Sequence, residues 1–117
     1  MLIDDSQDMR SLMRLLLESE GYEVEEANDG KQALKKLAKS SAPNLIFLDY
    51  HMPVMNGPEF VLAFEKKHPD IFSRVPVILL TALDSVDVSK THATEVVNKK
   101  QSVDQLVVLA QKYLKNN

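Results

Sequence analysis

Residues 45–60 read LIFLDYHMPVMNGPEF, and this stretch decides the fold. The run from Leu45 to Leu48 is continuously apolar and ends at Asp49, which is typical of a strand covered on both faces, as in a parallel sheet. Pro58 then fits the first turn of a helix that we expect to run to about His68. The stretch therefore predicts one strand–loop–helix unit of a parallel α/β sheet.

Short apolar runs and amphipathic stretches alternate on both sides of this unit. Further strands are predicted at residues 2–3, 22–27, 77–80 and 96–97, and further helices at residues 7–20, 31–39 and 102–113. Residues 83–92 are polar and weakly periodic, which predicts a fourth helix that is short or irregular. Strands separated by helices pair in parallel with right-handed crossovers. The sequence thus predicts an α/β fold with a doubly wound, five-stranded parallel sheet.

Length and composition limit what the chain can be. Its 117 residues, 44% hydrophobic and 26% charged, are the profile of one soluble globular domain, so we expect residues 1–117 to form a single domain. The absence of cysteine excludes disulfides, thiolate metal sites and cysteine nucleophiles. A formal charge of −3 gives no electrostatic case for direct contact with nucleic acid. No apolar run approaches the ~20 residues that cross a bilayer, so we expect a cytoplasmic protein without membrane contact.

Polar side chains follow four of the predicted strands. They are Asp4 and Asp5, Asp49, Thr81 and Lys99. The carboxyl ends of parallel strands meet at one edge, so we expect these groups to converge in one crevice. Carboxylates in contact need a raised pKa or a bound cation, and hard oxygen ligands favour Mg²⁺. A carboxylate beside Mg²⁺, an ammonium and a hydroxyl suits phosphoryl transfer, with Asp49 as the nucleophile.

Each of these residues also has a plainer explanation. Asp4 and Asp5 could cap the following helix, Asp49 could cap a loop, and Thr81 could be an ordinary strand end. Lys99 could be one more solvated surface lysine. What favours a shared site is their joint placement, one after another, at successive strand ends.

The pattern resembles the receiver domain of two-component response regulators. The resemblance covers essentially the whole chain and is most specific in the segment from Leu48 through Met52-Pro53 to Asn56-Gly57. It implies a flavodoxin-like sheet with strand order 2-1-3-4-5. It also implies a cytoplasmic phosphorelay domain that takes a phosphoryl group from a histidine kinase or a histidine phosphotransfer protein and then acts on a downstream protein target.

The resemblance also implies roles for individual residues. Asp49 would be the phosphoacceptor, Thr81 would hydrogen-bond the phosphoryl group, and Lys99 would neutralise it. The Mg²⁺ ligands would be the carboxylates of Asp5 and Asp49 and the backbone carbonyl of His51, with Asp4 close by or acting through water. The side chains of His51 and Leu83 would control access of water to the aspartyl phosphate. Such a domain catalyses its own phosphorylation and dephosphorylation and is not otherwise an enzyme.

Four features depart from the family pattern. Lys100 stands where the family usually has a proline in a cis peptide; because a non-proline cis bond costs ~2.5–4 kcal/mol, we expect a trans bond and some repositioning of Lys99. Val96 stands where the family has an aromatic residue whose ring moves between a buried and an exposed rotamer, and valine has no ring to move. The segment from Thr81 to Lys99 is shorter than usual by about one helical turn of ~3.6 residues. His92 stands where a glycine normally closes the fourth helix.

These departures leave alternatives open. A pseudo-receiver that keeps the fold and acts as a protein-interaction module without phosphorylation is one of them. An enzyme on the same kind of sheet is another. A flavin protein should have a Ser/Thr/Gly-rich loop after its first strand, and an aspartyl phosphatase should have an acid where this chain has His51. Neither feature is present, so a receiver remains the leading interpretation.

Overall fold

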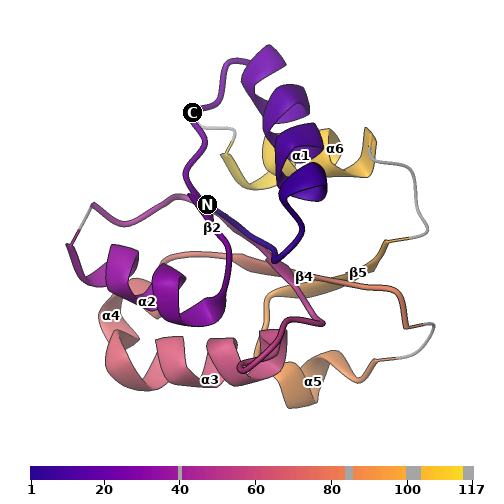
Figure 1. Cartoon of the computed structure of the whole chain (residues 1–117). Coiled ribbons are helices and arrows are strands. Elements are labelled where there is room, and N and C mark those ends of the chain that lie inside the picture. The colour runs from indigo at the N-terminus through magenta and orange to yellow at the C-terminus, as the bar shows by residue number, and fades with distance from the viewer. Residues whose placement is uncertain (40, 84–85, 100–103, 115–117) are drawn as a thin grey trace.

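Five parallel strands form the centre of the molecule in the order β2-β1-β3-β4-β5 (Figure 1). This is a computed structural model, and it describes residues 1–39, 41–83, 86–99 and 104–114. The strands are β1 (Leu2–Ile3), β2 (Glu26–Ala27), β3 (Ile46–Asp49), β4 (Val77–Thr81) and β5 (Glu95–Asn98). The predicted sheet and its strand order are confirmed.

Helices cover both faces of this sheet, as Figure 1 shows. They are α1 (Gln7–Ser19), α2 (Gly30–Lys39), α3 (Gly57–Lys67), α4 (Pro69–Phe72), α5 (Val88–Thr91) and α6 (Asp104–Leu114). α1 and α6 pack together on one face, and α2, α3 and α5 lie on the other. None of the helices within the described ranges has the length and apolar character that crossing a bilayer requires.

Alternation along β3 and β4 divides the core between the two faces. Ile46 and Leu48 contribute to the cluster under α2 and α3, whereas Phe47 contributes to the cluster under α1 and α6. Successive side chains of a strand point to opposite faces, so a continuously apolar strand serves two cores at once. All residues of β3 and β4 are buried, including the polar Asp49 and Thr81 at their carboxyl ends.

The predicted strand at residues 22–27 is wrong in its extent. Only Glu26 and Ala27 pair, because β1 offers just two partners, with Leu2 opposite Glu26 and Ile3 opposite Ala27. Tyr22 instead packs against the core under α1 and α6. β1 is as short as the sequence indicates, and its two residues pair with only two residues of β2.

The predicted short fourth helix is confirmed as α5, a single turn. His92 closes it in the left-handed conformation, with φ at 59°, the geometry usually taken by glycine. Its Nδ1 atom lies 2.8 Å from a carboxylate oxygen of Glu65 on α3. The expectations for Asp84, Ser85, Lys100 and residues 102–103 lie outside the described residues.

The start of α3 is locked against the end of β3. Asn56 accepts from the backbone N–H of Glu59 and donates its own N–H to the Glu59 carboxylate, both at 2.9 Å, which makes a capping box. The Gly57 N–H donates to Tyr50 O at 2.8 Å. A Cβ at Gly57 would lie 2.7 Å from the backbone oxygen of Asp49, so only glycine permits this approach.

We therefore expect Gly57→Ala to lower the free energy of unfolding by about 1–3 kcal/mol, since backbone must move to accommodate the methyl group. Gly30→Ala is the matched control, because its Cβ would meet only the flexible side chain of Met55. Urea unfolding followed by circular dichroism measures both variants. Equal stabilities of the two variants would contradict the tight contact between α3 and β3.

Candidate functional site

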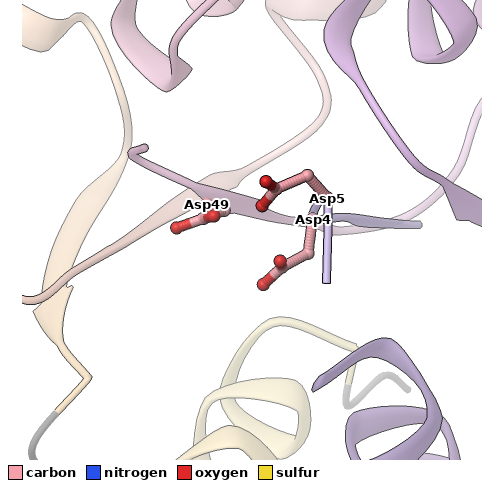
Figure 2. A group of neighbouring side chains, drawn as sticks. All are labelled: Asp4, Asp5 and Asp49. Atoms are coloured by element: carbon pink, nitrogen blue, oxygen red, sulfur yellow. The ribbon is translucent and has the colours of Figure 1, made fainter. Parts of the chain in front are cut away.

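Three carboxylates gather at the carboxyl edge of the sheet (Figure 2). Each of Asp4, Asp5 and Asp49 offers an oxygen, and these oxygens all lie within 4.8 Å of one another. Asp4 follows β1 and Asp49 ends β3, and the parallel pairing of Ile3 with Leu48 brings these strand ends side by side. Asp4 and Asp49 are 2% and 4% exposed, whereas Asp5 is exposed.

Lys99 supplies the nearest positive charge. Its Nζ atom lies 2.8 Å from Asp49 Oδ1 and 3.7 Å from Asp4 Oδ2. The Lys99 N–H donates to Thr81 O at 2.7 Å, which continues the β4–β5 pairing by one residue beyond the strand. Because this backbone contact fixes the start of the side chain at the sheet edge, the ammonium is directed at the carboxylates.

Asp4 remains incompletely compensated. Its Oδ1 accepts from the Ser6 N–H at 2.9 Å, but its Oδ2 is buried and accepts no hydrogen bond within the described part of the chain. Burial raises the pKa of Asp4, and the neighbouring charge of Asp49 raises it further, while the Ser6 N–H lowers it. A buried carboxylate oxygen that accepts no hydrogen bond among the described residues, in a group of three carboxylates, fits a hard divalent cation such as Mg²⁺.

Thr81 lies at the end of β4 and is 1% exposed. Its Oγ1 accepts from the Leu83 N–H at 3.0 Å, and the Leu83 carbonyl in turn accepts from Asn98 Nδ2 at 3.2 Å. A hydroxyl that accepts one hydrogen bond still has its own proton to donate. Thr81 therefore offers a donor at the same sheet edge and is coupled to the segment that leads toward α5.

His51 lies in the exposed loop after β3. Its backbone N–H is 3.4 Å from Asp49 Oδ1, and its ring is tilted against Tyr50 with centroids 4.8 Å apart. The same loop contains Val54, 86% exposed with φ at 70°, a strained backbone for a β-branched residue. The proposed role of the His51 carbonyl as a metal ligand stays a prediction.

The structure brings the predicted residues to one edge of the sheet. Lys99 contacts Asp4 and Asp49, and Asp5 completes the carboxylate group. Sequence analysis missed Arg10, whose Nη1 atom donates to the Asp4 carbonyl at 2.6 Å. Its place in the first turn of α1, the helix that directly follows the acids, is the signal that could have pointed to it.

The buried Oδ2 of Asp4 leads to a test of stability without metal. We expect Asp4→Asn to stabilise the metal-free protein by about 1 kcal/mol at neutral pH, because an incompletely compensated buried carboxylate is replaced by a neutral amide that can donate to Asp49. Asp5→Asn is the control and should gain less, since Asp5 is exposed. Urea unfolding in the presence of a chelator measures both.

The gain should depend on pH in a defined direction. Because burial raises the pKa of Asp4, the native protein takes up this proton at a higher pH than the unfolded chain does. The wild type therefore gains stability relative to Asp4→Asn as the pH falls, and the difference between them shrinks toward the ordinary carboxyl pKa. A difference that grows in acid would contradict this assignment.

Comparison with known proteins gives a consistent result. A family model described as the response regulator receiver domain matches residues 1–111. The chain is 43% identical over 82 residues to the transcriptional regulatory protein CpxR homolog of Haemophilus influenzae, which covers 70% of this chain and 33% of that protein. CpxR of Escherichia coli K12 is 41% identical over 85 residues, covering 73% and 34%. The chain spans about a third of the length of these relatives.

Solved structures show the same fold. The chemotaxis protein CheY4 of Vibrio cholerae superposes with a TM-score of 0.84 at 32% identity, covering 96% of this chain and 94% of that one. The response regulator protein TrrA of Thermotoga maritima, in complex with Mg²⁺ and BeF, superposes with a TM-score of 0.80 at 34% identity, covering 96% and 95%.

Proposed function

The chain belongs to the response regulator receiver domain family, and we propose that it accepts a phosphoryl group on Asp49, with Mg²⁺, from a histidine kinase or a histidine phosphotransfer protein. The observation that carries this proposal is the Lys99 ammonium, 2.8 Å from Asp49 Oδ1, inside a group of three carboxylates. Phosphorylation and Mg²⁺ binding are general features of the family.

The proposed transfer is a displacement at phosphorus. A carboxylate oxygen of Asp49 forms the new P–O bond while the P–N bond to the donor imidazole breaks, and the electron pair of that bond stays on the imidazole nitrogen. Lys99 and the Thr81 hydroxyl would then face the new phosphoryl oxygens. An aspartyl phosphate adds roughly −1.5 to −2 charges and three acceptor oxygens, so it draws such donors inward.

Asp5 and Asp49 would hold Mg²⁺ through their carboxylates, Asp4 directly or through water, and His51 through its backbone carbonyl. When bound, Mg²⁺ would neutralise charge on the transferring phosphoryl group. The buried Oδ2 of Asp4 and the closeness of the three carboxylates support this ligand set.

We further propose that residues 1–117 form one receiver domain of a cytoplasmic phosphorelay, which changes its interaction surface for a downstream protein target. Its own chemistry would be limited to self-catalysed phosphorylation and dephosphorylation. The relatives named as transcriptional regulators extend well beyond the region that matches this chain.

A second candidate is a pseudo-receiver that works as an interaction module without phosphorylation. It is favoured by α5, which is only one turn long, and by a cavity of about 420 Å³ lined by Val96, Leu83 and Leu109 among others. Failure of Mg²⁺ to bind at tens of millimolar, measured by NMR, would favour this candidate.

We expect acetyl phosphate with Mg²⁺ to add one phosphoryl group to the wild type, because the Asp49 carboxylate is the nucleophile. Asp49→Asn should take no label. Asp70→Asn, which alters an exposed acid on α4, is the control and should be labelled like the wild type. Intact-protein mass spectrometry and peptide mapping measure the label. Absence of labelling in a folded wild type would leave the interaction module as the better interpretation.

Two side chains beside the site should set the lifetime of the aspartyl phosphate. His51 is exposed in the loop after β3, and Leu83 is 42% exposed just after β4. We expect His51→Ala and Leu83→Ala to change the dephosphorylation rate while leaving the fold intact, because each alters the path of the attacking water. Loss of label over time measures the rate. Unchanged lifetimes in both variants would dismiss this role.

A further inference from the structure

Arg10 connects the acidic loop to the edge of the sheet. Its Nη1 atom donates to the Asp4 carbonyl at 2.6 Å, and its Nε atom donates to Glu26 Oε1 at 2.9 Å. The Arg10 side chain is 13% exposed, so both contacts are largely shielded from water. A planar guanidinium holds two acceptors in a fixed relative geometry, which an ammonium cannot do.

Glu26 is a rigid anchor for this contact. It is the first residue of β2, an edge strand of the sheet, and its second carboxylate oxygen pairs with Arg14 Nη1, one helical turn beyond Arg10 on α1. The Glu26 backbone carbonyl accepts from Lys36 Nζ on α2. Burial opposes ionisation of Glu26, but the hydrogen bonds from Arg14 and Arg10 lower its pKa and keep it charged.

The loop that carries the acids depends on such an anchor. β1 contributes only Leu2 and Ile3 to the sheet, so Asp4 lies just beyond the end of the strand. Asp4 is then held at three atoms: its N–H donates to Ala27 O at 3.2 Å, its Oδ1 accepts from Ser6, and its carbonyl accepts from Arg10. Of these three hydrogen bonds, the one from Arg10 has a charged donor.

We propose that Arg10 is a positioning residue for the metal and phosphoryl site, holding the Asp4–Asp5 loop at the sheet edge through its bridge from the Asp4 carbonyl to Glu26. The inference rests on the proposed function, because it takes the acids of this loop to be ligands of Mg²⁺. Arg10 itself touches neither the metal ligands' carboxylates nor the phosphoacceptor in the contacts the structure describes.

The sign of the effect distinguishes this role from simple electrostatics. Arg10 carries a positive charge close to a cation site, so removing that charge alone should tighten Mg²⁺ binding. Loss of positioning should weaken it, because partners that orient metal ligands typically contribute 10–100-fold to metal affinity. Arg10→Gln should therefore weaken Mg²⁺ binding if Arg10 positions the loop, and tighten Mg²⁺ binding if only its charge matters.

The test is a Mg²⁺ titration of the full chain by ¹H–¹⁵N NMR and calorimetry. We expect Arg10→Gln to weaken Mg²⁺ binding by about tenfold and Arg10→Lys to weaken it less. Arg14→Gln is the matched control. It removes the same charge and one of the two arginine contacts of Glu26. The described contacts of Arg14 are with Glu18, Glu26 and the Val24 carbonyl, whereas Arg10 also contacts Asp4. The Mg²⁺ affinity of Arg14→Gln should stay within about twofold of the wild type.

Amide hydrogen exchange in metal-free protein gives a second readout. The Ser6 N–H, bonded to Asp4 Oδ1, should exchange faster in Arg10→Gln than in Arg14→Gln when the two variants are equally stable. If the wild type binds no Mg²⁺, the proposed function fails, and Ser6 exchange alone decides the role of Arg10. If the wild type binds Mg²⁺ and Arg10→Gln binds it equally or more tightly, the positioning role is overturned.

Discussion

Repulsion among three carboxylates at one sheet edge is the constraint on which the rest of the site depends. The parallel pairing of β1 with β3 forces Asp4 and Asp49 together in a buried place, where like charges are costly. The Lys99 ammonium, which lies close to both carboxylates, offsets part of this negative charge. The remaining negative charge, including the buried Oδ2 of Asp4, is the feature that supports the proposed divalent-cation site.

The side chains of such a site must be held in place, and three sets of contacts hold them. Gly57 lets α3 approach the Asp49 backbone, so the start of α3 packs directly against the end of β3. The backbone contact from Lys99 to Thr81 fixes the ammonium relative to β4. Arg10 fixes the acidic loop relative to β2. By contrast, α5 is one turn, and strain is concentrated at Val54 in the loop beside Asp49. Firmly held acids beside a one-turn helix fit the proposed change of interaction surface.

Much of the fold and of the candidate site could be predicted from the order of residues along the chain. The continuous apolar runs that end at Asp49 and Thr81 indicated buried parallel strands, and the alternation of strands and helices predicted the sheet and its crossovers. Acids, a threonine and a lysine at successive strand ends predicted where polar groups would meet. The extent of β2 was not predictable in this way, because Tyr22–Ala27 has the local pattern of a strand and only the shortness of its partner limits the pairing.

The sequence by itself determined the fold class and the residue types at the sheet edge, because these follow from local periodicity and the rules of parallel connection; the strand order came from the resemblance to the receiver family. Only the tertiary structure decided which groups bond. That Lys99 contacts Asp49 more closely than Asp4, and that Arg10 joins the Asp4 carbonyl to Glu26, depends on strand register and side-chain direction. Register and side-chain direction depend on packing between segments that are distant in the chain.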